Sequence, residues 1–387
     1  MKPHQKHAKL TRPIKGTFGA MEWAILGTPC GAIKKLAYQL TKALADDYRV
    51  AYIDADHKSA DTEAETGRDQ DTALGNGAWL EFTDKITFSR LDYNTAFNEF
   101  DYREQFRSAD VVLVNGNHFP AARQIAVIDA RKPLKKKLAK LTQVDLLLLQ
   151  EGETEVPDYV QEALGGTLPA VIPIAEIDKI VDFLRSRIAI MTPKVKGLVL
   201  AGGKSQRMQK DKGLLNYHGL PQREYVHALL QKAGVEEVFF SCRPEQVSEL
   251  GVERSLPDEF LGLGPFGGML TAFKADPNAA WLVVACDLPF MTTATIEQLL
   301  EGRNLSKIAT AFHNPATDFP EPLITLWEPR AYSRLLHFLA LGYSCPRKVL
   351  INSEIELLQH AQPEEMANVN KPEEYEAAVK KLKNLQA

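Results

Sequence analysis

A cationic loop between residues 198 and 215 carries the side chains with the clearest chemical potential. The loop follows an apolar run, turns at Gly202 and Gly203, and holds Arg207 and Lys212. Glycines let backbone N–H groups approach an anion closely, and the basic side chains can neutralise its charge. A strand that runs into such a loop is an arrangement that binds phosphate, so this stretch predicts a nucleotide site.

A carboxylate suited to a divalent metal follows another apolar run farther along the chain. Residues 279–286 read AAWLVVAC, and Asp287 comes directly after them. An acidic side chain at the carboxyl end of a buried parallel strand points into the crevice where α/β folds bind ligands. Carboxylate oxygens are typical Mg²⁺ ligands beside phosphate groups. We therefore expect Asp287 to bind Mg²⁺ opposite the phosphate loop.

The first half of the chain contains a strand–glycine–helix pattern that departs from a P-loop. Residues 27–36 read GTPCGAIKKL. Against the pattern G-x-x-x-x-G-K-[ST], the second glycine is replaced by Ala32, the lysine by Ile33 and the hydroxyl residue by Lys34. We therefore expect this half to bind GTP weakly or not at all, although Lys34 remains able to meet an anion at the helix N-terminus.

Strands alternate with helical patterns along the first half, which predicts an α/β fold with a parallel sheet. Leucines at helical spacing follow the GTPCG turn, and a polar stretch at 59–79 is expected to be a loop. The expected strands lie at 22–27 and 49–57 and around residues 86, 112, 125 and 147. The runs VVLV and LLLL are typical of central strands buried on both faces.

Length and composition bound the remaining possibilities. A chain of 387 residues predicts two domains, and a polar connection around Pro193 divides it into residues 1–192 and 193–387. The net charge of −4 offers no broad basic surface for nucleic acid, and no apolar run is long enough to span a membrane. The basic first fifteen residues lack the apolar core of a signal peptide, so we expect a solvated arm. Four scattered cysteines fit a reducing cytoplasm.

The second half resembles the molybdenum cofactor guanylyltransferases over about residues 195–380. The family signature LAGG-x-S-x-R-M-G-x-D-K is present in register from Leu200 to Lys212, except that Gln209 replaces a glycine. The other landmarks follow in order: Pro257-Asp258, GPFGGM from Gly264, CDLPF around Asp287, PEPLITLW near Leu323 and NVNKPEEY from Asn368. The resemblance implies a Rossmann-like nucleotidyltransferase domain.

The resemblance also implies a reaction and its residues. GMP passes from GTP to the terminal phosphate of molybdenum-loaded molybdopterin, giving molybdopterin guanine dinucleotide and pyrophosphate, with Mg²⁺ at Asp287. Arg207 and Lys212 would hold the phosphates. The residues expected around the nucleotide are Leu200, Ala201, Gly202, Gly203, Lys212, Ser241, Asp258, Gly264, Gly267, Gly268 and Asp287, and those on the pterin side are Asn368 and Asn370. Apart from the resemblance, the positive charge of Arg347 makes it a further pterin-side candidate for the pterin phosphate. Ser241 stands where an asparagine is common in the family.

Simpler interpretations stay open for several of these residues. Asp258 could be a turn residue, Asn368 and Asn370 could be turn formers before the helix that starts at Pro372, and Arg347 could be an ordinary surface arginine. Two rival functions also stay open. One is a cytidylyl- or sugar-phosphate nucleotidyltransferase, and the other is a non-catalytic carrier of the molybdenum cofactor.

The first half resembles the molybdopterin-guanine dinucleotide biosynthesis adaptor proteins, which are P-loop α/β domains. The resemblance is carried by GTPCGAIKKL, by DADH at 54–57, by VVLVNGNHFPAARQIAVID at 111–129 and by VIPIAEIDKIVDFL at 171–184. An acid–glycine pair usual in that family is replaced by Asn115 and Gly116. The whole chain is thus expected to hold two three-layer α/β domains, an adaptor-like one with a degenerate P-loop and a nucleotidyltransferase, with a recipient molybdoenzyme as a further candidate partner.

Overall fold

The computed structural model describes residues 10–14, 16–55, 72–202 and 211–386. The chain divides into two compact units. The N-terminal unit is Lys15–Met191, and the C-terminal unit is Thr192–Ala387 together with the start of the chain. Within that start, residues 10–14 are exposed, and the amide of Ile14 donates to Asn278 Oδ1 at 2.6 Å.

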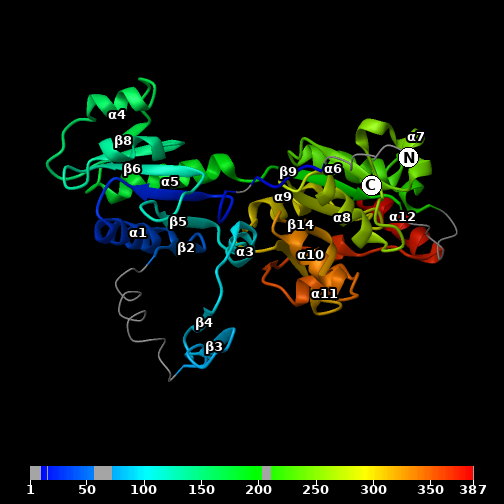
Figure 1. The fold of residues 1–387 in the computed structure, drawn as a ribbon. Helices are drawn as coiled ribbons and strands as arrows, with labels where there is room; N and C mark the ends of the chain where they lie inside the picture. The colour runs from blue at the N-terminus through cyan, green and yellow to red at the C-terminus, as the bar shows by residue number, and fades with distance from the viewer. Residues whose placement is uncertain (1–9, 15, 56–71, 203–210, 387) are drawn as a thin grey trace, which may run out of the picture. The chain divides into compact units, whose positions relative to one another are not determined.

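The N-terminal unit is built on a parallel sheet of six strands in the order β2-β5-β1-β6-β7-β8 (Figure 1). The strands are β1 (Glu22–Leu26), β2 (Val50–Ile53), β5 (Val111–Asn115), β6 (Arg123–Ile128), β7 (Val144–Leu149) and β8 (Ala170–Pro173). The apolar runs of β5 and β7 are buried, which confirms the expectation of central strands.

Helices cover both faces of this sheet. On one face α1 (Cys30–Leu44) and α5 (Ile177–Met191) pack on the strands through buried leucines and isoleucines. The other face is covered by η1 (Leu134–Lys140) with α4 (Asp158–Ala163), and by aromatic residues that include Tyr102 of α3 (Glu99–Gln105). The unit is therefore an α/β fold with a parallel sheet, as the alternation of patterns predicted.

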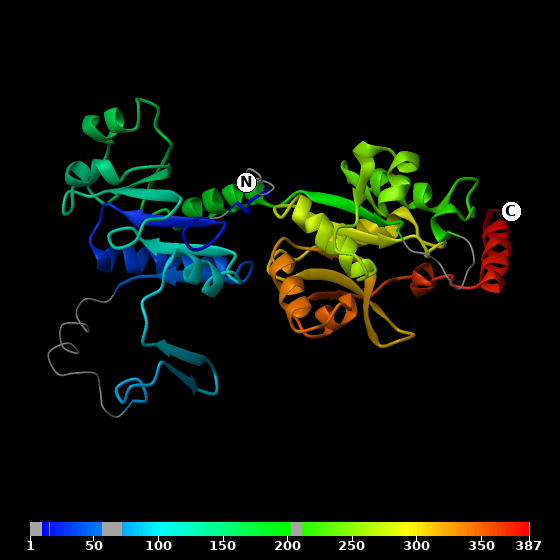
Figure 2. The ribbon, with the colours of Figure 1, turned by 45° about the vertical axis from the view of Figure 1, so that its right-hand side comes forward.

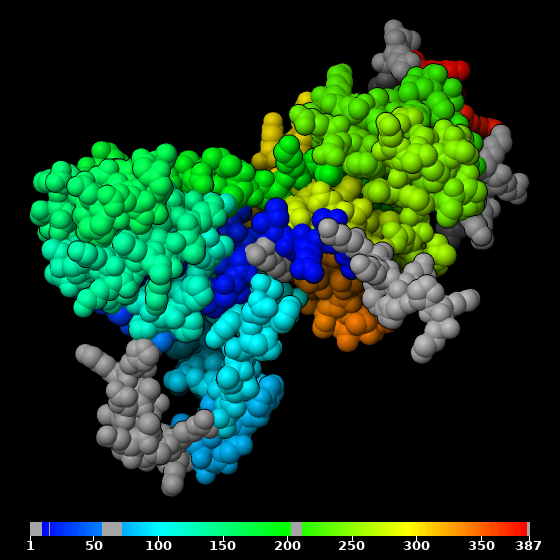
Figure 3. All heavy atoms as spheres, turned by 45° about the horizontal axis from the view of Figure 1, so that its top comes forward, coloured from blue at the N-terminus to red at the C-terminus, as the bar shows by residue number. Residues whose placement is uncertain are grey.

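One expected strand is not part of the sheet. The expected segment KITFSRL starts in the turn of a separate antiparallel hairpin, β3 (Leu80–Asp84) and β4 (Ser89–Tyr93), and only its last residues, from Ser89, lie in a strand. Ile86 has a φ of 68° and is 96% exposed, so it cannot lie in a buried strand. The hairpin projects from its unit in light blue (Figure 3). Hydrophobicity without burial misled the sequence interpretation here.

The C-terminal unit has a mixed sheet of seven strands in the order β11-β10-β9-β12-β14-β13-β15. These are β9 (Val195–Leu200), β10 (Val238–Cys242), β11 (Ser255–Pro257), β12 (Ala280–Ala285), β13 (Ala309–Asn314), β14 (Phe319–Trp327) and β15 (Glu356–Leu358). The first four in space are parallel, whereas β14 runs antiparallel to both of its neighbours. The carboxyl ends of β9, β10, β11 and β12 consequently meet at one edge.

Helices cover both faces of this sheet (Figure 2), and a hydrophobic cluster lies on each face. On one face lie α6 (Gln222–Lys232), α7 (Val247–Leu250) and α9 (Thr293–Glu301). On the other lie α8 (Pro265–Ala275), α10 (Ala331–Ala340) and α11 (Pro346–Ile351). The last helix, α12 (Pro372–Gln386), packs through a small separate cluster that contains Tyr217 and Val369. Pro221 is the N-cap of α6, with extended backbone (ψ 137°).

No helix among the residues described has both the length and the apolar character needed to cross a membrane.

Candidate nucleotide site

A pocket opens at the edge where the parallel strands of the C-terminal unit end. Its walls come from the β9 end and the loop that follows, from η2 (Lys212–Leu214), and from the ends of β10, β11 and β12. The lining residues are Leu200, Ala201, Gly202, Asp211, Lys212, Gly213, Ser241, Asp258, Gly264, Pro265, Ala285, Cys286, Asp287 and Leu323. This is the edge at which open α/β sheets bind ligands.

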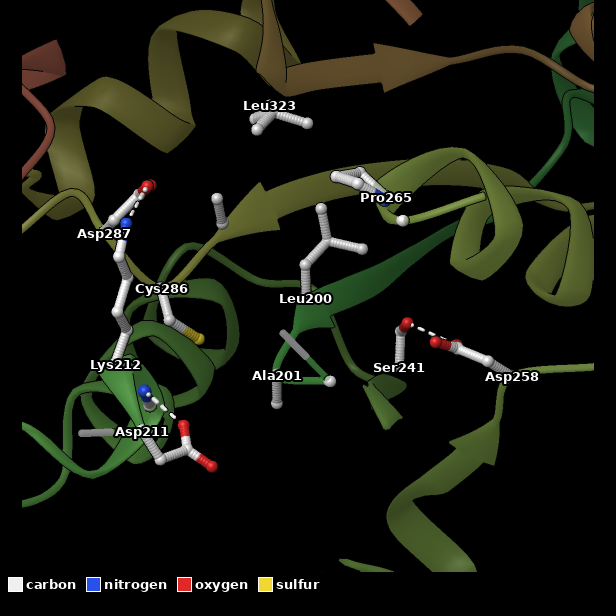
Figure 4. A pocket seen from close by; sticks show the side chains of 14 residues that line it. Leu200, Ala201, Asp211, Lys212, Ser241, Asp258, Pro265, Cys286, Asp287 and Leu323 are labelled. Atoms are coloured by element: carbon white, nitrogen blue, oxygen red, sulfur yellow. Dashed lines mark hydrogen bonds and ion pairs between the residues drawn. The ribbon is translucent and has the colours of Figure 1, made fainter. Parts of the chain in front are cut away.

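A cation and a carboxylate meet on one side of the pocket (Figure 4). Lys212 Nζ lies 3.2 Å from Asp287 Oδ2 and donates to Asn370 Oδ1 at 2.5 Å. The lysine and aspartate side chains are 21% and 18% exposed, so the pair is partly shielded from water and still open to the pocket. An anion entering here would meet a positive charge that is already oriented.

The short helix η2 holds Lys212 in place through its capping residue. Asp211 Oδ1 accepts from the amide of Gly213 at 2.9 Å, and Asp211 Oδ2 accepts from Gln246 Nε2 at 3.2 Å. Gln246 also donates to the carbonyl of Ala201 at 3.4 Å. Asp211 therefore links the cation-bearing turn, through Gln246, to the end of β9.

The C-terminal segment brings Asn370 to this cluster. The amide of Val369 donates to the carbonyl oxygen of Asp287 at 2.8 Å. The Glu374 carboxylate accepts from the amides of Asn370 and Lys371 at 2.7 and 3.2 Å. These backbone hydrogen bonds lower the pKa of Glu374 below its usual value. The first turn of α12 thereby fixes the loop that carries Asn370.

A second carboxylate lies on the other side of the pocket, away from Lys212 and Asp287 (Figure 4). Ser241 Oγ donates to Asp258 Oδ1 at 2.7 Å, and the Asp258 amide donates to the carbonyl of Cys242 at 2.9 Å. Burial raises the pKa of Asp258, and the Ser241 hydrogen bond opposes that rise. Asp258 is thus a partly desolvated acceptor with a fixed orientation.

Two glycines allow the backbone to approach this carboxylate closely. A Cβ at Gly268 would lie 2.3 Å from Ser241 Oγ, and one at Gly202 would lie 3.3 Å from Asp258 Oδ2. At the start of α8, Gly264 has a φ of 58°, which glycine adopts readily. Neither Gly267 nor Gly268 lines the pocket, although both were predicted to, and a Cβ at Gly267 would lie 2.2 Å from the carbonyl of Phe260.

The remaining predicted residues are not found in the lining of the pocket. Gly203 and Arg207 lie outside the described residues. Asn368 is exposed and does not line the pocket. Arg347, at the start of α11, also does not line it, and Nη2 of this residue lies 3.9 Å from Glu321 Oε2.

Several lining residues were not predicted. They are Cys286, Ala285, Pro265 and Leu323, together with Asp211 and Gly213 of the signature loop. Their position directly beside a predicted strand end or glycine is the signal that could have identified most of them. Cys286 is buried, and burial raises the pKa of its thiol, so it is a wall of the pocket rather than a nucleophile.

The sequence of the C-terminal unit matches a known family. The family is that of the MobA-like NTP transferase domain, and the match covers residues 197–379. A molybdenum cofactor guanylyltransferase of Xanthomonas euvesicatoria is 33% identical over 189 residues, which is 46% of this chain and 91% of that protein. The chain belongs to the MobA-like NTP transferase family. Its C-terminal unit is a nucleotidyltransferase.

The chain is also similar to two further proteins. A molybdenum cofactor biosynthesis bifunctional protein of Synechocystis is 35% identical over 199 residues, which is 51% of this chain and 57% of that protein. The crystal structure of molybdopterin-guanine dinucleotide biosynthesis protein A from Archaeoglobus fulgidus is 22% identical, with a TM-score of 0.42, and covers 49% of this chain and 99% of that one. The family match begins at residue 197, so the adaptor-like identity of the first half stays a prediction.

Proposed function

We propose that the C-terminal unit transfers GMP from GTP to molybdenum-loaded molybdopterin, giving molybdopterin guanine dinucleotide and pyrophosphate. The observation that carries the proposal is the pairing of Lys212 with Asp287 at one side of the pocket, with Asp258 held by Ser241 at the other. Because these two pairs lie on different sides of the pocket, one polar region is available for the phosphates and another for the base. The family to which the chain belongs supports the same reaction.

The phosphate side suits an in-line displacement. An oxygen of the pterin's terminal phosphate attacks the α-phosphorus of GTP, and the bond from that phosphorus to the bridging oxygen of pyrophosphate breaks. Such a step needs positioning and charge neutralisation more than covalent help from the protein. Lys212 can turn its ammonium donors from Asn370 and Asp287 to the phosphate oxygens. Arg207 is proposed to act beside it.

The base side favours guanine. A carboxylate accepts from the ring N1–H and the exocyclic amine of guanine together, a donor pair that cytosine does not present. Asp258 has the required acceptor oxygens, and Ser241 fixes their orientation. Gly202 and Gly268 let the surrounding backbone come close. We propose Asp258 as the residue that distinguishes GTP from CTP.

Asp287 fits a magnesium ion shared with the substrate phosphates. Mg²⁺ in nucleotide sites is commonly held by one or two carboxylates plus phosphate oxygens. The structure describes no cluster of three or more acidic, histidine or cysteine side chains suited to a metal, so the protein's share would be Asp287. When bound, Mg²⁺ neutralises charge on the reacting phosphates.

The pterin is proposed to lie beside the C-terminal segment, where Asn370 already contacts Lys212. None of the three candidates lines the pocket, and Asn368 and Arg347 are weaker than Asn370 because no contact with Lys212 or Asp287 is described for them. The N-terminal unit is proposed to be adaptor-like with a degenerate P-loop. A recipient molybdoenzyme is a proposed partner of the chain.

The test is turnover with GTP, Mg²⁺ and molybdenum-loaded molybdopterin, with dinucleotide and pyrophosphate both quantified. Lys212→Ala should lower kcat by about one hundredfold to one thousandfold, because a preorganised charge on the phosphates is lost. Lys232→Ala, at the exposed end of α6, is the matched control and should keep wild-type activity.

Two results would contradict the proposal. A preference for CTP over GTP would favour a cytidylyltransferase. A folded wild-type protein that binds the pterin but forms no dinucleotide would favour a carrier.

A further inference from the structure

A second cluster of reactive side chains lies in the N-terminal unit, at the carboxyl ends of its parallel strands. Cys30 begins α1 just after β1, Asp54 directly follows β2, and His118 lies in the turn after β5. These three strands are neighbours in the sheet, in the order β2-β5-β1. Three segments distant in the sequence therefore place a thiol, a carboxylate and an imidazole at one edge.

The thiol and the imidazole are in direct contact. Cys30 Sγ lies 3.4 Å from His118 Nε2, and the same nitrogen lies 3.8 Å from Asp54 Oδ1. Asp54 is itself oriented, because it accepts from Asn115 Nδ2 and from the Tyr52 hydroxyl, each at 2.7 Å. An imidazole that takes the thiol proton would thus gain its positive charge beside a fixed carboxylate.

Two further donors surround the sulfur. Asn117 Nδ2 lies 3.4 Å from Cys30 Sγ and also donates to the carbonyl of Thr28 at 3.1 Å. Lys137 of η1 donates to Asn117 Oδ1. Burial and the charges of Lys132 and Lys140 lower the pKa of Lys137, and the nearby Cys30 opposes that shift. A cation is therefore held near the sulfur, on the oxygen of the same Asn117 amide whose nitrogen contacts Cys30.

The four cysteines of the chain differ in their surroundings. Cys242 and Cys286 are buried, Cys345 is exposed, and Cys30 is half-buried. Cys30 has a base within reach and remains open to small reagents, whereas the hydrogen bonds described for Cys345 are those of its backbone. A cysteine beside a histidine is the arrangement of an activated nucleophile.

We propose that Cys30 is a nucleophilic thiol with His118 as its general base, and that it takes disulfides or other electrophiles that carry an anionic group. The anionic preference follows from Lys137. In the reaction with a disulfide, His118 Nε2 accepts the thiol proton, Cys30 Sγ bonds to one sulfur of the disulfide, and the other sulfur leaves as a thiolate. One disulfide is consumed and one mixed disulfide forms, so no other oxidant is needed.

The test uses the full chain in a Cys345→Ser background and two disulfide probes. The probes are dithionitrobenzoate, which is anionic, and 4,4′-dithiodipyridine, which is neutral. Both release a coloured thiol whose appearance gives the rate, and mass spectrometry of the peptides locates the label. His118→Gln should slow both probes by about tenfold or more because the base is lost. Lys137→Gln should slow dithionitrobenzoate several-fold and leave the neutral probe unchanged.

A second measurement uses no substitution at Cys30, His118 or Lys137, so its result does not depend on whether a variant folds. In the wild-type chain the label should reach Cys30 before the more exposed Cys345. If Cys345 reacts first with both probes, or if folded His118→Gln reacts at the wild-type rate, the assignment is wrong. Equal slowing of both probes by Lys137→Gln would remove the anionic preference.

Discussion

Replacing Gly268 by alanine should disable base recognition without touching the phosphate side of the pocket. The added Cβ would lie 2.3 Å from Ser241 Oγ, closer than real Cβ atoms come to a neighbour. The serine hydroxyl can rotate away, but rotation breaks its 2.7 Å hydrogen bond to Asp258. A hydrogen bond to a charged group contributes about 1.5–3 kcal/mol. Since 1.4 kcal/mol is a factor of ten, GTP binding should weaken by about tenfold to one hundredfold.

Calorimetric titration with GTP and with ITP tests the reasoning, because inosine lacks the exocyclic amine of guanine. The ratio of the two affinities should fall in Gly268→Ala, since an Asp258 without its serine partner no longer holds one orientation. Ser241→Ala should give a similar loss. The double variant should be scarcely worse than Ser241→Ala alone, because both changes remove one hydrogen bond.

Additive losses in the double variant would refute this reasoning, as would wild-type affinity for GTP in Gly268→Ala. Thermal unfolding of each variant separates loss of the site from loss of the fold.

Two further predictions concern carboxylates outside the pocket. Glu374→Gln should lower turnover by roughly threefold to tenfold, because a neutral acceptor holds the amide of Asn370 less strongly, while the adjacent Glu373→Gln should not. The hydrogen bonds from Arg131 lower the pKa of Asp129, whereas burial raises it. The hydrogen bonds have the larger effect, so the pKa of Asp129 falls from 3.8 to about 2. A depressed folded-state pKa gives stability that is present above 3.8 and lost as the pH falls through about 2. The Tm of the wild-type chain should therefore exceed that of Asp129→Asn at pH 5, and the difference between the two Tm values should shrink toward pH 2. A difference that stays constant with pH would contradict this linkage between stability and protonation.

Local patterns predicted the strand ends well because their cause is local. Buried apolar runs end where polar residues begin, so Asp287 and the loop before Lys212 could be placed at one edge of a parallel sheet. The same reasoning placed β5 and β7 in the interior of the N-terminal sheet, where each has a neighbouring strand on both sides. It failed at Ile86, where an apolar residue occupies the exposed turn of a hairpin.

Contacts between distant segments could not be read from such patterns. Asn370 meets Lys212 because α12 returns to the sheet edge, and nothing in either segment encodes that return. The prediction for Arg347 rested on charge, and the packing of α11 places it near Glu321 instead of in the pocket. The antiparallel direction of β14 likewise depends on tertiary packing, because its apolar run is compatible with either direction.

Because Lys212 contacts Asn370, the segment just before α12 should respond when a ligand binds in the pocket. The Lys212 ammonium holds Asn370, two residues before α12 begins, while the amide of Val369 is protected by the carbonyl of Asp287. A ligand that recruits the lysine withdraws a partner from this segment, so amide hydrogen exchange at residues 369–371 should respond to binding. Releasing Asn370 from Lys212 costs free energy, so this step weakens the binding of the nucleotide. A pterin that forms a new contact with Asn370 would recover that free energy, and the two ligands would then favour each other's binding.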